Sequence, residues 1–236
     1  MEPTRSTHIK ICCMASIGEA ALALSAGADA LGFVMRMPSG PGPIAEELAR
    51  EIIATVPPGV PTFMLTSEIE ADAILDQLEV TGANTVQIVD FVTPGTRQRL
   101  REAKPTLRIV QVVHVTGPES IDEARIAAQT SDMILLDSGN PSAKIKELGG
   151  TGRVHDWSVS RRIRGSIDVP LWLAGGLRAD NVAAAIEAVR PYGVDVCSGV
   201  RTAGPLDPDK VRAFEAAVRS AAPGTESRAR REIQAP

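Results

Sequence analysis

The sequence predicts a single (β/α)8 barrel, also called a TIM barrel, and three observations predict it. Short apolar segments alternate with helix-like segments along nearly all of the 236 residues. Eight such pairs follow one another, which is the number that closes a barrel. A doubly wound sheet usually has five or six strands, and no glycine-rich dinucleotide fingerprint follows the first strand here. We therefore expect a barrel domain over residues 1–221, with a polar, disordered tail over 222–236.

The expected strands are short runs rich in Val, Ile and Leu, as in a parallel sheet that is covered on both faces. In chain order they cover residues 8–13, 29–34, 60–65, 84–89, 107–115, 132–137, 169–175 and 193–199. After each strand comes a segment with the mixed apolar and charged pattern of an amphipathic helix. These helices cover residues 18–27, 44–56, 70–80, 95–103, 119–129, 156–164, 179–190 and 207–221.

Composition and charge narrow the class of partner. Only 3% of the residues are aromatic while 44% are hydrophobic, so Ala, Val, Ile and Leu must build the core. The net charge of -4 gives no basic surface for nucleic acid. No apolar run approaches the roughly 18 residues of a membrane span, and the first ten residues lack the apolar region of a signal peptide. We expect a small-molecule partner and a cytoplasmic protein, either a monomer or a homodimer.

The chain has 3 cysteines, and two of them, Cys12 and Cys13, are adjacent. Adjacent cysteines rarely bridge each other, and Cys197 is the only other thiol, so we expect no disulfide framework and a reducing compartment. There is no CxxC motif, and the 3 histidines are not in ligand spacing. The spacing of these residues therefore predicts no metal site.

Alternation along the first strand separates the two adjacent cysteines. His8, Lys10 and Cys12 share one face and should point into the barrel, whereas Ile9, Ile11 and Cys13 should face the helices. Cys12 then lies nearest the carboxyl end of the barrel, where enzymes of this fold carry their chemistry. Cys12 is a candidate for a working thiol, and the alternative is a buried, inert one. Cys13 is expected to be a packing residue.

Three later strand ends also carry polar or glycine-rich groups. Asp137 stops the sixth apolar run, either as a site residue or as a helix cap or solvated loop residue. Gly149 to Gly152 follow it in a long loop. Gly175 and Gly176 end the seventh strand, and Ser198 and Gly199 follow the eighth, where barrels commonly bind phosphate through backbone N–H groups. The alternative is a pair of tight turns without a ligand.

Several of these segments together resemble the phosphoribosylanthranilate isomerase family of tryptophan biosynthesis. They are "KICC", "GADALGFV", "LLDS", "GGTGRVHDW", "LAGGLRADNVAAAI" and "RPYGVDVCSGV", and they span the chain from about Ile9 to Val218. The resemblance implies a barrel without metal or cofactor. It also implies an Amadori rearrangement of N-(5′-phosphoribosyl)anthranilate to 1-(2-carboxyphenylamino)-1-deoxyribulose 5-phosphate.

The resemblance assigns roles to individual residues. Cys12 falls on the family's general base, which takes the proton from the second sugar carbon. Asp137 falls on the general acid, which protonates the ring oxygen so that the sugar opens to a Schiff base. Asp195 would hold a sugar hydroxyl. The phosphate would lie against a set of small residues: Gly150, Gly175, Gly176, Ser198 and Gly199.

The implied reaction requires pKa shifts in opposite directions for the two candidate catalytic groups, Cys12 as the base and Asp137 as the acid. A free thiol has a pKa of about 8.5, so Cys12 needs help to act as a base at neutral pH. Lys10, two residues earlier on the same face, could give that help as part of the substrate site, or could be a structural charge paired with a carboxylate inside the barrel. Asp137 needs a raised pKa, which partial burial favours.

The sequence departs from the family pattern on the side that would hold the aromatic ring. Cys13 replaces a glycine, and Pro41 stands where an arginine usually grips the anthranilate carboxylate, with Arg36 as the nearby substitute. Val89 and Asp90 replace a histidine and a glycine, and "VQVVHV" replaces a lysine–alanine pair. Three functions stay open: an authentic isomerase, an isomerase of a different phosphoribosyl amine, and a phosphosugar-binding protein without catalysis.

Overall fold

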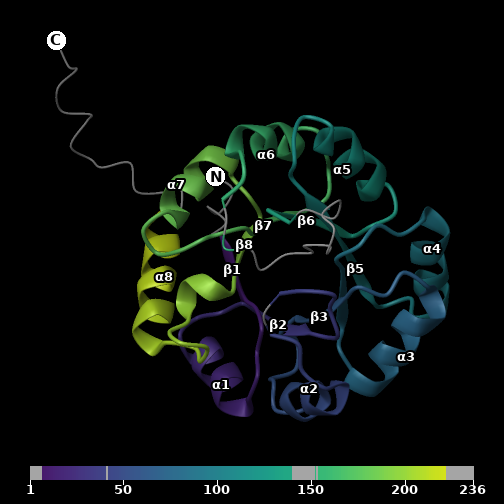
Figure 1. Ribbon diagram of the computed structural model, residues 1–236, viewed down its shortest axis with the longest axis horizontal. Helices are drawn as coiled ribbons and strands as arrows, with labels where there is room; N and C mark the ends of the chain where they lie inside the picture. The colour runs from purple at the N-terminus through teal and green to yellow at the C-terminus, as the bar shows by residue number, and fades with distance from the viewer. Residues whose placement is uncertain (1–6, 41, 140–151, 153, 222–236) are drawn as a thin grey trace.

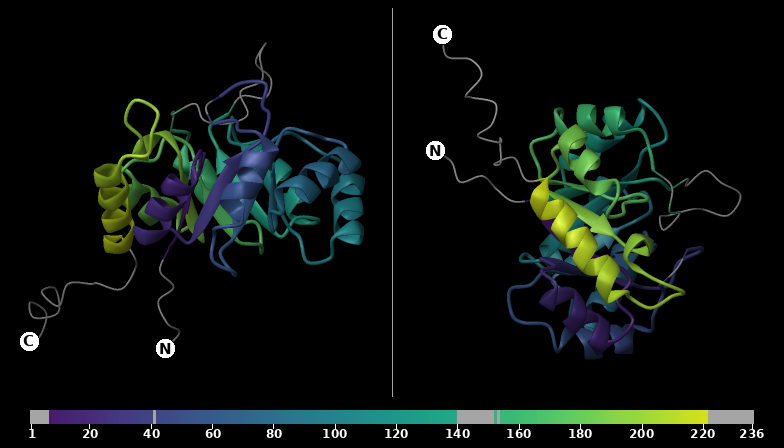
Figure 2. Two further views of the ribbon diagram at one scale, coloured as in Figure 1. Left: turned by 90° about the horizontal axis from the view of Figure 1, so that it is seen from below. Right: turned by 90° about the vertical axis from the view of Figure 1, so that its left-hand side faces the viewer.

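Eight parallel strands close into a barrel in the order in which they occur in the chain, which confirms the predicted fold class. The computed structural model describes residues 7–40, 42–139, 152 and 154–221. Figure 1 shows the ring of strands enclosed by a ring of helices, and Figure 2 shows the barrel from the side. The expected tail over 222–236 lies outside the described residues, so the domain boundary at 221 stays a prediction.

The strands are short and almost entirely buried. Their bounds are β1 His8–Ile11, β2 Ala30–Val34, β3 Thr62–Thr66, β4 Thr85–Ile88, β5 Arg108–His114, β6 Met133–Asp137, β7 Leu171–Leu173 and β8 Gly193–Val196. Strands β1, β7 and β8 end earlier than their apolar runs predict, because the chain turns at Cys13, Gly175 and Ser198. The barrel closes where Lys10 of β1 pairs in register with Asp195 of β8.

Helices follow the strands one by one. Their bounds are α1 Ile17–Ser25, α2 Glu46–Ile53, α3 Ala71–Thr81, α4 Pro94–Ala103, α5 Ser120–Ala128, α6 Trp157–Arg164, α7 Val182–Val189 and α8 Pro208–Ser220, with a 3-10 turn, η1, at Ser198–Val200. Side-chain caps set several of their starts: Ser16 for α1, Asp156 for α6 and Asp207 for α8. Within the described residues, no helix has the length and hydropathy to cross a membrane.

The core has two layers, as alternating strand residues require. One apolar layer lies between strands and helices and includes Ile9, Ile11 and Val194. A second lies inside the barrel and includes Phe63, Leu135 and Trp172. With one face of every strand packed against helices, the chain can place polar groups only at the barrel ends or in paired form inside it.

Candidate active site

A pocket opens among the carboxyl ends of the strands, with a volume of about 710 Å³ that includes space open to solvent. Residues from both halves of the chain line it: Cys12, Cys13, Val34, Met37, Ser39, Gly40, Leu65, Gln87, Val89, Asp137, Gly152, Ala174, Gly175, Gly176, Leu177, Asp195, Val196, Cys197 and Ser198. Cys12 follows β1, Asp137 ends β6 and Asp195 lies in β8. The structure thus brings the expected thiol and both expected carboxylates to one pocket.

Cys12 is nearly buried, with 5% of its surface exposed. Its backbone N–H donates to the Val196 carbonyl at 2.8 Å, which ties the end of β1 to β8. Its sulfur lies against the backbone of β2, because a Cβ at Gly32 would come within 2.7 Å of Cys12 Sγ. Glycine at 32 therefore leaves the room that the thiol occupies.

Lys10 is paired with a carboxylate inside the barrel, which is one of the two arrangements that the sequence leaves open. Its Nζ lies 2.7 Å from Asp195 Oδ2 and 5.0 Å from the centre of the Phe63 ring. Lys10 is fully buried and is not among the pocket-lining residues. Burial alone would lower the pKa of Lys10, but the charge of Asp195 and the thiol of Cys12 raise it overall. Lys10 is therefore a buried cation beside Asp195 and Cys12.

Asp195 keeps one carboxylate oxygen for another partner. Oδ2 pairs with Lys10, whereas the buried Oδ1 has no hydrogen-bond partner among the described residues. A buried acceptor without a donor is costly unless a ligand supplies one. Asp195 lines the pocket, so this oxygen is available to a hydroxyl group of a bound molecule.

Asp137 ends β6 beside His114 of β5, with which it is paired in register. Burial raises the pKa of the Asp137 carboxyl. The N–H of Ser138, which donates to Asp137 Oδ1 at 2.7 Å, opposes that effect without cancelling it, and so do the charges of His114 and Lys10. A carboxyl with a raised pKa can hold a proton and give it to a substrate oxygen.

The expectation that Cys13 faces the helices is wrong. Cys13 adopts a left-handed backbone conformation, with φ at 66°, and its side chain lines the pocket with Cys12 and Cys197. Strand alternation ends with β1 at Ile11, and the left-handed turn carries the Cys13 side chain to the inner side. Hydrogen bonding with the thiols of Cys12 and Cys197, together with burial, raises the pKa of Cys13 well above its ordinary value.

Small residues from three loops gather at one side of the pocket. Gly152, Gly175, Gly176 and Ser198 line it, and a Cβ at Gly152 would lie 3.9 Å from Ser198 Oγ. No hydrogen bond to the backbone N–H groups of Gly175, Gly176, Ser198 or Gly199 occurs within the part of the chain that the structure describes. Such a group of N–H donors is suited to an anion.

Larger residues at two of these glycines would collide with neighbouring protein atoms. A Cβ at Gly175 would come within 2.9 Å of His155 Nδ1, and one at Gly199 would overlap the Leu177 carbonyl oxygen. Gly175 and Gly176 also have φ angles of 87° and 61°, in the region that favours glycine. Gly150 lies outside the described residues.

Arg36 is not brought into the pocket. Its side chain is exposed on the segment after β2, and it is not among the lining residues. Most of the lining from this part of the chain is apolar, with Val34, Met37, Leu65 and Val89, and it also includes Ser39, Gly40 and Gln87. Pro41, which stands at the position of the family's arginine, lies outside the described residues.

Sequence reasoning missed Gln87 of β4. Its side chain is 3% exposed, lines the pocket, and has an Oε1 atom with no hydrogen-bond partner among the described residues. The inward position of Gln87, two residues before Val89, was the available signal.

Metal ligation finds no support in the described part of the chain, where no three His, Cys, Asp or Glu side chains are grouped to hold an ion.

The site lies at the carboxyl end of a closed parallel barrel and combines an acidic group, a thiol and a glycine-lined cradle. This is the arrangement of an enzyme of the (β/α)8-barrel class. The family model for N-(5'-phosphoribosyl)anthranilate isomerase matches residues 9–217. The chain belongs to this family.

Relatives and solved structures agree with the family match. The chain is 37% identical to N-(5'-phosphoribosyl)anthranilate isomerase of Methanothrix thermoacetophila, over 91% of this chain and 99% of that protein. The corresponding protein of Haloferax volcanii is 37% identical, over 91% of this chain and 94% of that protein. The Thermotoga maritima enzyme structure superposes with a TM-score of 0.79 at 30% identity, covering 91% of this chain and 99% of that chain.

One solved structure contains a ligand. It is a phosphoribosyl anthranilate isomerase in complex with reduced 1-(o-carboxyphenylamino)-1-deoxyribulose 5-phosphate. Its TM-score is 0.76 at 28% identity, and the match covers 91% of this chain and 99% of that chain.

Proposed function

We propose that this chain catalyses the Amadori rearrangement of N-(5′-phosphoribosyl)anthranilate to 1-(2-carboxyphenylamino)-1-deoxyribulose 5-phosphate, the isomerase step of tryptophan biosynthesis, and that Cys12 and Asp137 carry the proton transfers. The observation that supports these roles best is the meeting of Cys12 and Asp137, from β1 and β6, in one pocket that also holds the glycine-lined cradle. Strands β1 and β6 are not neighbours in the barrel, so the two groups approach a substrate from different sides.

The acid step begins the reaction. Asp137 gives its proton to the ring oxygen of the ribose, the bond from that oxygen to the first sugar carbon breaks, and the nitrogen forms a Schiff base. The raised pKa of Asp137 supports this role, because burial keeps the carboxyl protonated to higher pH.

The base step follows at the second sugar carbon. Cys12 takes its proton, the electron pair shifts toward the Schiff base nitrogen, and an enolamine forms. Protonation of the first carbon and loss of the hydroxyl proton at the second then give the ketone, so atoms and electrons balance without a cofactor. Lys10, a buried cation on the same side of β1, lies beside the Cys12 thiol.

Asp195 and the glycine turns hold the phosphoribosyl half in this proposal. The free Oδ1 of Asp195 accepts a sugar hydroxyl, and the N–H groups of Gly175, Gly176, Ser198 and Gly199 meet the phosphate. The apolar wall of Val34, Leu65 and Val89 takes the aromatic ring. Gly150 remains a proposed member of the phosphate site.

The test is a fluorescence assay of the purified chain, with phosphoribosylanthranilate generated in place. We expect its fluorescence to disappear, and the reduced product analogue to bind. Binding without turnover would support a phosphosugar-binding protein instead, while neither binding nor turnover would point to a different phosphoribosyl amine.

The oligomeric state, expected to be a monomer or a homodimer, is measured on the same sample by light scattering. One solved relative, from Thermotoga maritima, is described as dimeric.

Arg36 stays a proposed contact for the anthranilate carboxylate, formed when substrate draws its exposed side chain inward. Arg36→Met should raise KM by about 10-fold and leave kcat within about 2-fold, because an interaction made equally in the ground state and in the transition state affects only KM. Steady-state kinetics with Arg50→Met, an exposed arginine on α2, is the matched control. An unchanged KM would remove Arg36 from the site.

A further inference from the structure

The backbone turn that carries Cys12 is held by an ion pair that the proposed chemistry does not use. Arg201, directly after η1, and Glu19, in the first turn of α1, are 182 residues apart in the chain. Arg201 Nη1 lies 2.8 Å from Glu19 Oε1, and Arg201 Nη2 lies 3.0 Å from Oε2. The side chains are only 12% and 14% exposed. This is the two-pronged geometry of a strong arginine–carboxylate contact.

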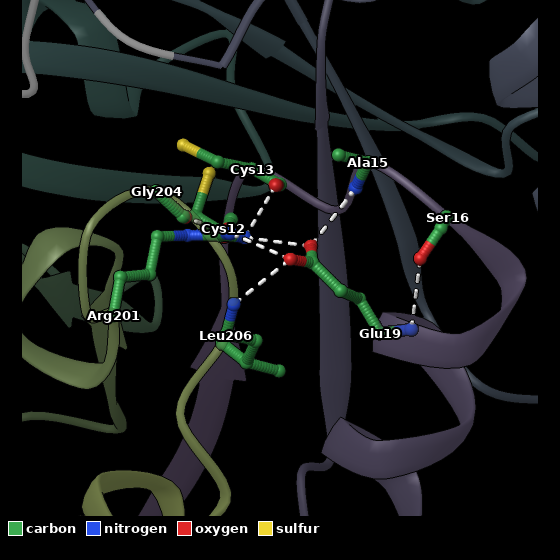
Figure 3. A network of polar contacts seen from close by, with 8 residues as sticks. All are labelled: Cys12, Cys13, Ala15, Ser16, Glu19, Arg201, Gly204 and Leu206. Atoms are coloured by element: carbon green, nitrogen blue, oxygen red, sulfur yellow. Dashed lines mark hydrogen bonds and ion pairs between the residues drawn. The ribbon is translucent and has the colours of Figure 1, made fainter.

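Each partner also bonds to the backbone of both loops, as Figure 3 shows. Arg201 Nη2 donates to the Cys13 carbonyl and, at 3.4 Å, to that of Cys12, while Nη1 donates to the Gly204 carbonyl at 2.9 Å. Glu19 accepts from the N–H of Ala15 at 3.1 Å and from that of Leu206 at 2.9 Å. The pair therefore fastens the loop after β8 to the turn after β1.

Each of the two loops contains a residue with a strained backbone conformation. Cys13 and Ala203 have φ angles of 66° and 50°, which residues other than glycine seldom adopt. Such conformations persist only where the surrounding structure holds them. Arg201 reaches the carbonyl of Cys13 itself and that of Gly204, next to Ala203.

We propose that Arg201, held by Glu19, is a positioning residue that fixes the Cys12–Cys13 turn and so aims the Cys12 thiol at the substrate. The proposal rests on the function assigned to Cys12 above. A catalytic base works only within hydrogen-bond reach of the proton that it removes, so a small displacement of the turn lowers kcat. Arg201 is not among the residues lining the pocket, so its loss should leave substrate binding largely intact.

The test compares Arg201→Met with Arg219→Met. Arg219 is a matched control at the other end of β1, because it also pairs with a glutamate, Glu215, and donates to two backbone carbonyls, those of Thr7 and Gly27. We expect Arg201→Met to lower kcat by about 10- to 100-fold with KM within about 3-fold, and Arg219→Met to lower Tm but not kcat.

A second comparison addresses the turn directly. In a Cys13→Gly background the left-handed conformation comes without strain, so removing Arg201 should cost several-fold less in kcat than it does in the natural chain. Arg201→Lys keeps the charge without the two-pronged contact and should have an intermediate kcat. If circular dichroism shows that Arg201→Met does not fold, the same comparisons are made with Arg201→Lys.

Three results would overturn the proposal: a kcat within 2-fold of wild type after loss of Arg201, an equal kcat loss in Arg219→Met, or an equal cost of Arg201 removal in the Cys13→Gly background. A wild-type chain without turnover would instead overturn the proposed function. Amide hydrogen exchange over residues 12–16 then decides the positioning role. The proposal expects faster exchange there in Arg201→Met and no change in Arg219→Met.

Discussion

His155 lies beside the glycine turn after β7 as a partly buried, neutral imidazole. Its Nε2 is 2.8 Å from Ser160 Oγ, and its buried Nδ1 has no hydrogen-bond partner among the described residues. Burial lowers the pKa of His155 to about 4, against a smaller opposing effect of Asp156. The unfolded chain therefore takes up a proton near pH 6.5 that the folded chain does not take up until about pH 4.

The sign of the pH effect follows. The folded pKa is the lower one, so stability is full above the unfolded pKa and is lost as the pH falls toward the folded value. Between pH 7 and pH 5, His155 should account for a loss of about 2 kcal/mol in the free energy of unfolding. His155→Gln should remove that part of the pH dependence in urea unfolding. An equal loss in the variant and in wild type would show that another group titrates in this range.

For individual residues, the sequence predicts which way a side chain points as long as the residue lies within a strand, where side chains alternate between the two faces. The inward position of Cys12 near a strand end and the apolar run that stops at Asp137 identify these two residues, whereas Asp195 is identified only by the family resemblance. Cys13 was misplaced because alternation stops where the strand stops, and a left-handed turn on a residue other than glycine has no signal in one sequence. The role of Lys10 stayed open because pairing with Asp195 depends on the register between the first and last strands.

Gly32 of β2 has no side chain, and this leaves space for the Cys12 side chain that follows β1. A Cβ at Gly32 would come within 2.7 Å of Cys12 Sγ and 3.2 Å of the Cys12 Cα. Gly32→Ala should therefore displace the thiol and lower kcat by about 10- to 100-fold, with a loss of about 1–3 kcal/mol in stability from overpacking. Kinetics and thermal unfolding of the variant check both effects.

Gly95→Ala is the matched control, because a Cβ in α4 would meet only Thr93 Oγ1, at 3.6 Å. Alanine at this exposed position in the first turn of α4 should stabilise the chain by at most about 0.5–1 kcal/mol without changing kcat. A Gly32→Ala enzyme with wild-type kcat would show that the thiol does not need this space.

The elements themselves were predictable because their apolar runs are separated by helix-like segments, and each predicted strand overlaps an observed one. Their ends were less so. The carboxyl ends of β1, β7 and β8 come early because left-handed or tight turns at Cys13, Gly175 and Ser198 interrupt the apolar run. Contacts between distant loops, such as that of Glu19 with Arg201, leave no local pattern and emerge only when the barrel closes.

At the scale of the whole molecule, barrel closure is what makes the site. The pairing of β1 with β8 places Asp195 and Lys10 side by side, and the ring of strands brings Asp137 of β6 to the same pocket as Cys12. Cys12 and Asp137, the proposed base and acid, come from elements more than 100 residues apart in the chain. We infer that these two groups act as one unit on one substrate.

The decisive experiment on this pair measures kcat for wild type, Cys12→Ala, Asp137→Asn and the double variant, with Asp168→Asn as an exposed control. Residues that act together are not additive, so each single variant should lose about 1000-fold or more and the double variant about 10-fold more at most. Asp168→Asn should match wild type. A tenth or more of wild-type kcat in either single variant would contradict the assignment of acid and base.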